Sequence, residues 1–211
     1  MQLKLFHGTN VEAAKMIIGQ QDFIDSTNDE DWLGKGVYFY DNYQNALEYI
    51  MYAYKSKYKK ENISYDKLFE RYTILEVDIE VDEDRIFDFN EFFSKYKYVI
   101  FTKAIFDKIK DNSAFVQQYY KDGFLINFFI ENTNFFDEID LTTNIFIREL
   151  PREFTLKSPY FKSRIAFEIK QRFYCLKNHG CIKNVSYFDK DTKKEFDIIK
   201  SIREWENSDE Y

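Results

Sequence analysis

The alternation of apolar and polar residues predicts strands toward both ends of the chain. Between Tyr72 and Val81, Leu75 and Val77 alternate with Glu76 and Asp78, which is the period of two of a strand with one wet face. Similar patterns predict strands over Gln2–Phe6, Val37–Tyr40, Asn144–Leu150, Ile165–Leu176 and Ile182–Phe188. The apolar run Phe124–Ile130 favours a further, buried strand.

Apolar residues spaced three and four apart predict helices between these strands. Asn10 is the expected N-cap of a helix that Gly19 ends, and Asn42 opens a second. Phe92–Ile109 is expected to form a third, and a charged helix follows residue 188. Strands grouped at the two ends with helices between them indicate an α+β fold. We expect one domain over residues 1–211, with an insertion and target-recognition region at about 82–163.

Composition and charge narrow the class of protein. The chain has 211 residues, an aromatic share of 20%, and few breakers, with 6 Gly and 2 Pro, so an ordered domain is expected. The net charge of -7 provides no global basic field for nucleic acid or an anionic membrane. No leader-like segment or run of about 18 apolar residues occurs. We therefore expect a soluble cytoplasmic protein with no membrane partner.

The two cysteines and the second histidine carry little functional signal. Cys175 and Cys181 lack a metal-ligand spacing, so we interpret them as free thiols and expect no metal. His179 lies in an Asn-His-Gly turn, where a surface position is the simplest expectation.

Two short phrases in the first forty residues suit a dinucleotide. Phe6-His7-Gly8-Thr9 closes an apolar strand, and Gly34-Lys35-Gly36-Val37-Tyr38-Phe39 leads into another. An imidazole at a strand end can hydrogen-bond a ribose hydroxyl. A glycine beside it lets the backbone approach a carboxamide.

The order and separation of these phrases resemble the NAD-binding half of ADP-ribosyltransferases of the poly(ADP-ribose) polymerase and diphtheria-toxin type. The resemblance covers residues 3–50 well and 164–188 loosely. It implies a split β-sandwich with an NAD cleft and a helical insertion, and NAD as the substrate. It implies that His7 contacts the adenosine-side ribose and that Gly8 contacts the nicotinamide amide. Thr9 belongs to the same NAD-binding motif.

The resemblance also implies an aromatic sandwich around the nicotinamide ring. Tyr38 would stack on one face of the ring, and Tyr49, eleven residues later, would close the other. Ala46 stands where a serine often helps to hold the carboxamide, so one polar contact of the family pattern is missing.

The third catalytic position departs from the family. A glutamate usually opens a late strand there, bonding the ribose and favouring the charge that develops as the glycosidic bond breaks. Here Gln171 aligns with it, and Glu168 is the rival, three residues away and so on the opposite strand face. Gln171 can orient a ribose but carries no charge. Elongation into polymer is therefore not expected, whereas a single transfer remains open.

The function expected from this resemblance is mono-ADP-ribosylation of a macromolecule, protein or nucleic acid. A compact acidic member fits an intracellular toxin held by an antitoxin protein, or a phage-defence enzyme. Gln171 and Ala46 motivate an alternative, a non-catalytic NAD or ADP-ribose binding module; an aromatic-rich interaction protein without a nucleotide site is a third possibility. The lysines and tyrosines at Tyr52–Lys60 suit either a solvated helix end, which we favour, or a nucleic-acid acceptor.

Overall fold

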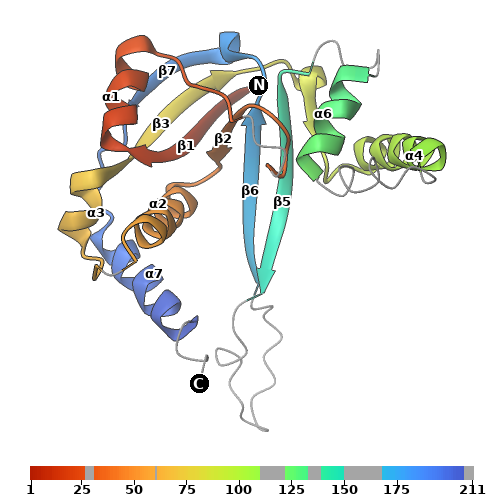
Figure 1. Ribbon diagram of the computed structural model, residues 1–211. Helices are drawn as coiled ribbons and strands as arrows, with labels where there is room; N and C mark the ends of the chain where they lie inside the picture. The colour runs from red at the N-terminus through yellow and green to blue at the C-terminus, as the bar shows by residue number, and fades with distance from the viewer. Residues whose placement is uncertain (27–30, 60, 110–121, 133–138, 150–167, 207–211) are drawn as a thin grey trace, which may run out of the picture.

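The computed structural model describes residues 1–26, 31–59, 61–109, 122–132, 139–149 and 168–206 (Figure 1). These residues form a mixed seven-stranded sheet in the order β4-β5-β6-β2-β1-β3-β7. Neighbouring strands are antiparallel, except for the parallel pair β4–β5. The α+β class expected from the sequence is confirmed.

The bounds of the elements are as follows. The strands are β1 (Gln2–Asn10), β2 (Val37–Tyr40), β3 (Tyr72–Glu80), β4 (Ile86–Asp88), β5 (Leu141–Glu149), β6 (Glu168–Leu176) and β7 (Ile182–Tyr187). The helices are α1 (Val11–Gln20), α2 (Tyr43–Lys57), α3 (Tyr65–Arg71), α4 (Phe92–Ile109), α6 (Asp122–Asn132) and α7 (Lys193–Glu206), with short 3-10 turns at Glu83–Arg85 and His179–Cys181.

The sheet is held together unevenly at its centre. All nine residues of β1 pair with β3, from Gln2 opposite Glu80 to Asn10 opposite Tyr72. On its other side, within the described residues, β1 pairs with β2 only through Phe6 opposite Tyr40. The sheet therefore divides into a β1–β3–β7 half and a β2–β6–β5–β4 half, which diverge from this pair (Figure 1).

Helices cover both faces of the β1–β3–β7 half. Alternation along β1 sends Leu5 to one face, where it packs with Ala14 of α1, and Gly8 to the other, against α2. Helices α2, α3 and α7 share a second core, in which Leu47 and Tyr54 are fully buried. The expected N-caps are confirmed, since Asn10 and Asn42 each accept a hydrogen bond from the backbone N–H three residues later.

The apolar run at residues 124–130 is a helix, so the predicted strand is wrong. Ile126 and Phe129 of α6 are buried against Phe87 and Phe89, which is burial at a spacing of three. A continuous apolar run fits a buried strand and a buried helix equally well. The packing partners decide between them: Phe87 lies in β4, and Phe89 follows that strand.

Several predicted boundaries also change. Gly19 does not end α1, because the helix continues to Gln20 and Gln21 takes the left-handed cap position with φ 54°. The Gln21 amide bonds the carbonyls of Ile18 and Val185, and so ties the helix end to β7. Strand β1 extends to Asn10, which places His7 inside a strand. Of the predicted strand 165–176, residues 165–167 lie outside the described residues.

The described part of region 82–163 belongs to the main sheet as well as flanking it. Strand β5 pairs along its whole length with β6, from Leu141 opposite Leu176 to Glu149 opposite Glu168. Helices α4 and α6 lie beside each other at the β4 edge (Figure 1). None of the described helices has the length and apolarity that crossing a membrane requires.

Candidate active site

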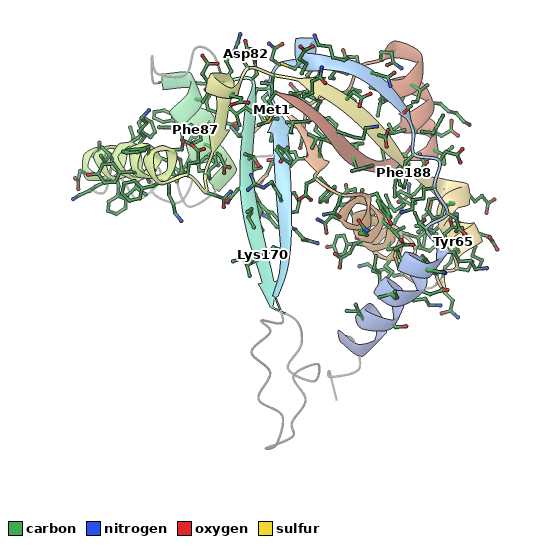
Figure 2. All side chains as sticks on the ribbon, turned by 180° about the vertical axis from the view of Figure 1, so that it is seen from behind. Met1, Tyr65, Asp82, Phe87, Lys170 and Phe188 are labelled. Carbon is green, nitrogen blue, oxygen red and sulfur yellow. The ribbon has the colours of Figure 1, made fainter. Side chains whose placement is uncertain are left out.

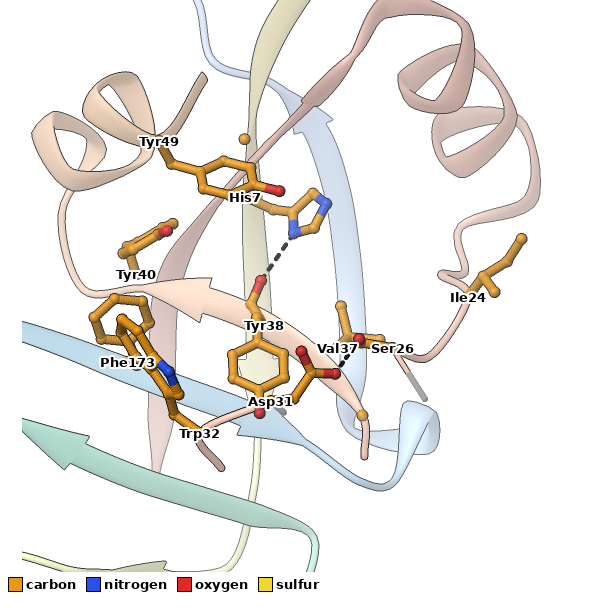
Figure 3. Close-up of a pocket in the computed structure, with 12 residues that line it drawn as sticks. His7, Ile24, Ser26, Asp31, Trp32, Val37, Tyr38, Tyr40, Tyr49 and Phe173 are labelled. Atoms are coloured by element: carbon orange, nitrogen blue, oxygen red, sulfur yellow. Dashed lines mark hydrogen bonds between the residues drawn. The ribbon is translucent and has the colours of Figure 1, made fainter. Parts of the chain in front are cut away.

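A cavity opens where β1 and β2 diverge, and we call it the His7 cavity (Figure 3). Its volume is about 290 Å³, close to the lower end of the range for ligand pockets. Residues from β1, the 24–36 segment, β2, α2 and β6 line it: His7, Gly8, Ile24, Ser26, Asp31, Trp32, Gly36, Val37, Tyr38, Tyr40, Tyr49 and Phe173.

His7 joins the two halves of the sheet at this cavity. Its Nδ1 lies 2.8 Å from the carbonyl oxygen of Tyr38. A carbonyl only accepts, so Nδ1 carries the proton and Nε2 is the acceptor of the ring. Packing edge-on against Phe23 and Phe39 desolvates the ring. This burial lowers the pKa of His7, and the bond to Tyr38 offsets it only in part, so the neutral imidazole is favoured.

The Tyr38 ring is anchored by its hydroxyl group. The hydroxyl donates to the carbonyl of Gly34 and accepts from the backbone N–H of Leu33, both at 2.8 Å. Burial, and to a smaller extent the nearby Cys175, raises the pKa of the Tyr38 hydroxyl. With the hydroxyl held by the loop, the ring is a fixed wall of the cavity (Figure 3).

Aromatic side chains from three elements form the opposite wall. The Tyr40 ring lies 6.1 Å from that of Tyr49 and 4.9 Å from that of Phe173, and Trp32 packs against Phe173 at 5.6 Å. Tyr49 is 45% exposed, so a ligand can reach its ring. Burial, and then the proximity of Tyr49 and Glu48, raises the pKa of Tyr40.

Gly8 has a structural role that the sequence reasoning did not identify. A Cβ built on Gly8 would lie 2.7 Å from Ile50 Cγ2 and 2.9 Å from the Ala46 carbonyl, so the glycine lets α2 cross β1 closely. Gly8 also lines the cavity, whereas Thr9 is not among the lining residues. Ala46 is fully buried at this crossing.

Gln171 lies in a second, adjoining cavity, which we call the Glu48 cavity. Its volume is about 330 Å³, and it shares Trp32, Tyr40, Tyr49 and Phe173 with the His7 cavity. Its remaining lining residues are Asn45, Glu48, Tyr52 and Gln171. Gln171 Nε2 donates to Glu48 Oε2 at 2.7 Å, with Asn45 Oδ1 at 3.4 Å.

Glu168, the rival of Gln171, is the first residue of β6. It pairs with Glu149 at the last register position of the β5–β6 ladder. Lys170, its near neighbour in β6, already lies toward the far end of these two strands (Figure 2). Gln171, three residues further along the strand, lines the Glu48 cavity.

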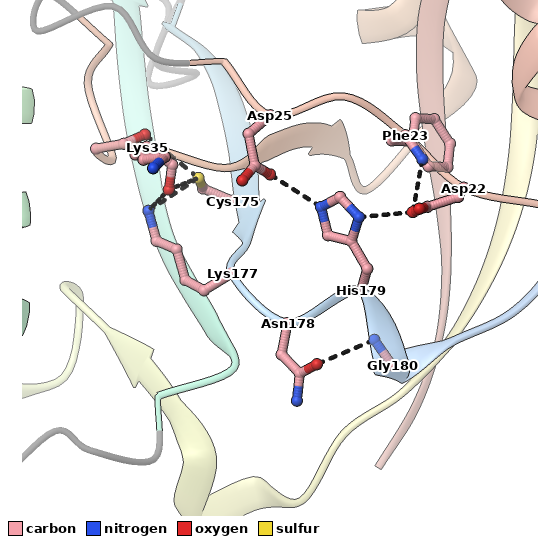
Figure 4. A network of polar contacts seen from close by, with 10 residues as sticks. Asp22, Phe23, Asp25, Lys35, Cys175, Lys177, Asn178, His179 and Gly180 are labelled. Carbon is pink, nitrogen blue, oxygen red and sulfur yellow. Dashed lines mark hydrogen bonds and ion pairs between the residues drawn. The ribbon is translucent and has the colours of Figure 1, made fainter.

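A polar network supports the loop that leads into β2 (Figure 4). Lys177 Nζ donates to the carbonyls of Leu33, at 2.7 Å, and of Lys35, and lies 3.1 Å from Cys175 Sγ. Burial lowers the pKa of Lys177 and raises that of Cys175. Both cysteines are free and buried. Gly36, with φ +143°, leaves no room for a Cβ, which would lie 2.3 Å from the Leu176 carbonyl.

His179 is partly exposed, and beyond the surface position expected from the sequence it makes two contacts with acidic side chains. Its Nδ1 lies 2.6 Å from Asp22 and its Nε2 2.9 Å from Asp25, with 27% of the side chain exposed (Figure 4). Burial disfavours the charged ring, but the two carboxylates outweigh it and raise the pKa of His179. The contact ties the β6–β7 turn to the segment that carries Ile24 and Ser26 of the His7 cavity.

The lysine-rich end of α2 does not form a stacking platform. Tyr54 is fully buried, and the Arg71 guanidinium covers the Tyr58 ring at 4.1 Å. Only Tyr52 of the three tyrosines is exposed. The solvated helix end therefore describes this segment better than a nucleic-acid platform does.

Glu48 and Asn45 are the site residues that the sequence reasoning missed. They stand three residues apart on α2, and Tyr52 follows at the next turn, so the three side chains form a polar stripe at helical spacing. That stripe is a signal, but its partner Gln171 lies in a strand far along the chain. Among the described residues, no cluster of His, Cys, Asp and Glu suits a metal ion.

Comparisons with known proteins give a single kind of relative. The chain is 25% identical over 204 residues to the uncharacterized protein MJ0359 of Methanocaldococcus jannaschii, with 90% of this chain and 88% of that protein covered. No family model matches the chain. No solved structure matches it significantly.

Proposed function

We propose that this protein is a mono-ADP-ribosyltransferase that binds the nicotinamide ribose end of NAD in the His7 cavity and transfers ADP-ribose to a macromolecule. The observation that carries the proposal is the convergence of His7, Tyr38 and Tyr49 on one cavity. These are the residues for which the sequence resemblance implies NAD contacts, and they come from three different elements.

The chemistry of the lining supports a cationic aromatic ligand. The faces of Tyr38, Tyr40 and Tyr49 suit a pyridinium ring, which is attracted to aromatic faces. Asp31 adds a carboxylate to the same lining, and no lysine or arginine is among the lining residues described. The cavity thus favours the positively charged nicotinamide ring, with the diphosphate lying toward solvent.

His7 supplies a polar contact to the adenosine-side ribose, the contact that the sequence resemblance implies. With Nδ1 donating to Tyr38, the acceptor Nε2 receives a hydrogen bond from a ribose hydroxyl. Its lowered pKa keeps this nitrogen unprotonated near neutral pH. A neutral imidazole also adds no second cation beside the nicotinamide ring.

The test is release of nicotinamide from NAD by the purified protein, followed by chromatography. Release should be lost in His7→Ala and Tyr49→Ala and retained in Tyr187→Ala, because Tyr187 is 46% exposed on β7 and lines neither cavity. NAD at a hundredfold its dissociation constant should also stabilise the wild type by about 2.7 kcal/mol. Absence of both stabilisation and release would overturn the proposal.

The acceptor and the biological role form a separate part of the proposal. We propose an intracellular toxin, restrained by an antitoxin protein or acting in phage defence. Mass spectrometry of cellular protein and nucleic acid after brief expression should find the added mass of ADP-ribose in one pool. The His7→Ala variant is the control for background modification.

A non-catalytic NAD or ADP-ribose binding module is the second candidate. An amide at position 171 and the buried Ala46 favour it, because neither stabilises a developing cation. NAD binding without nicotinamide release, in the presence of cell extract as a source of acceptors, would select this module over the transferase.

A further inference from the structure

Glu48 places a carboxylate at the candidate site from an element where the sequence resemblance expects none. The residue lies in the second turn of α2 and is 8% exposed. Burial of a carboxylate is costly unless polar partners compensate it. Its position in a cavity wall, next to the proposed ligand site, therefore calls for a functional explanation.

Gln171 holds this carboxylate. Its Nε2 donates to Glu48 Oε2 at 2.7 Å, which is a charge-assisted distance. Gln171 occupies the position on β6 where the family pattern has a glutamate. The Glu48–Gln171 pair therefore contains one carboxylate, from α2, and one amide, from β6. The pair brings to the Glu48 cavity the negative charge that Gln171 alone lacks.

The Glu48 cavity adjoins the proposed nicotinamide ribose site. Tyr40 and Tyr49 line both cavities, and Glu48 lines the second cavity together with them. A nicotinamide ribose seated at the boundary of the two cavities, beside the Tyr49 ring, therefore lies next to Glu48.

We propose that Glu48 is the catalytic carboxylate of this protein and that Gln171 is its positioning residue. This inference rests on the proposed function. Glu48 accepts a hydrogen bond from a hydroxyl of the nicotinamide ribose and stabilises the positive charge that develops on that sugar. A carboxylate supplied by a helix thus replaces one supplied by the strand.

The reaction is balanced without a further reactant. The bond between ribose C1 and the nicotinamide nitrogen breaks, and its electron pair goes to that nitrogen, so nicotinamide leaves as a neutral molecule. The acceptor nucleophile then forms a bond to C1. Its proton passes to the Glu48 carboxylate and on to solvent.

The experiment compares NAD affinity with the rate of nicotinamide release in full-length protein. Glu48→Gln should lower kcat about a hundredfold or more, as loss of a transition-state contact does, while the dissociation constant of NAD changes little. The matched control is Glu70→Gln, which removes the same charge from an exposed position on α3 and should leave both values unchanged. Thermal unfolding confirms that each variant is folded.

The double variant Glu48→Gln/Gln171→Glu tests the role of Gln171. It retains one carboxylate and one amide with their positions exchanged, so it should recover at least about tenfold in kcat over Glu48→Gln, or 1.4 kcal/mol. A purely structural role of the pair predicts no such recovery. If Glu48→Gln does not fold, Glu48→Asp replaces it in the test. This variant keeps the charge but withdraws it by one methylene group, so kcat should fall about tenfold or more.

The outcomes separate the two proposals. A wild type that neither binds nor cleaves NAD refutes the proposed function. A wild type that cleaves NAD, with Glu48→Gln retaining its kcat, refutes the role of Glu48 and leaves the function standing. Loss of activity in Glu48→Gln without recovery in the double variant refutes the positioning role of Gln171.

Discussion

The Nδ1 of His7 lies 2.8 Å from the carbonyl oxygen of Tyr38, beside the single residue pair that joins β1 to β2. This hydrogen bond adds a side-chain link between the two halves of the sheet at the edge of the candidate site. It also sets the tautomer of His7, because the carbonyl requires a donor. The stability of the sheet and the chemistry of the site therefore depend on the same side chain.

The first prediction concerns the pH dependence that His7 contributes to stability. Its folded-state pKa is below the unfolded value of about 6.5, so the unfolded chain binds a proton more readily. The wild type should lose free energy of unfolding relative to His7→Gln as the pH falls below about 6.5. Urea unfolding of both proteins from pH 8 to pH 5 measures this difference. Parallel curves would contradict it.

The second prediction concerns His179 and has the opposite sign. Asp25 and Asp22 raise its folded-state pKa, so its contribution is fully present below about 6.5 and is lost as the pH rises through the folded value. The stability advantage of the wild type over His179→Gln should thus shrink above about pH 6.5. Thermal unfolding across this pH range checks it. An advantage that grows with pH would show that the two carboxylates do not hold a charged ring.

The third prediction concerns the crossing of α2 over β1. Gly8→Ala should destabilise the protein by about 1 to 3 kcal/mol through overpacking, because the new Cβ meets Ile50 and the Ala46 carbonyl. Gly19→Ala is the matched control, since a Cβ there meets nothing within 4 Å. In the α1 helix it should be stabilising by about 1 kcal/mol. Denaturant unfolding measures both, and equal effects would rule out the close crossing as the cause.

The fourth prediction concerns Asp140, which is 5% exposed. It accepts hydrogen bonds from Arg85 at 2.9 Å and from Asn178 at 2.8 Å, and so links the turn before β4 to the end of β6. Asp140→Ala should lower the free energy of unfolding by about 1.5 to 3 kcal/mol, because a buried carboxylate loses two hydrogen bonds, one of them to a charged group.

The control for Asp140 is Asp78→Ala. Asp78 lies 3.9 Å from Lys4, and 43% of its side chain is exposed, so its loss should cost less than about 1 kcal/mol. Equilibrium unfolding in urea compares the two variants. Similar losses for both would mean that burial does not distinguish the two ion pairs.

The three residues that carry the proposed function lie within the first fifty of the chain. His7, Tyr38 and Tyr49 come from β1, β2 and α2, and helix α1 lies between β1 and β2 in the chain. The alternation in β1 and β3 and the caps at Asn10 and Asn42 are equally local. The alternation and the caps depend on backbone geometry and neighbouring side chains, which is why the sequence indicated them, whereas the roles of His7, Tyr38 and Tyr49 are what the family resemblance implies.

Contacts between segments far apart in the sequence could not be predicted from the sequence. The apolar run that became α6 satisfies either secondary structure alone, and only packing against Phe87 and Phe89 made it a helix. Glu48 meets Gln171 because β6 pairs with β2, whose end leads into α2. His179 likewise contacts Asp22 and Asp25, which lie far from it in the sequence.

By itself, the sequence determined the α+β class, most elements and the residues of the local motifs, because their signals repeat over two to four residues. Tertiary structure decided which face of α2 meets β6, where the sheet opens, and which carboxylate adjoins the candidate site. The physical reason is that side-chain periodicity specifies which face of an element is buried, whereas the partner of that face depends on chain segments that only folding brings together.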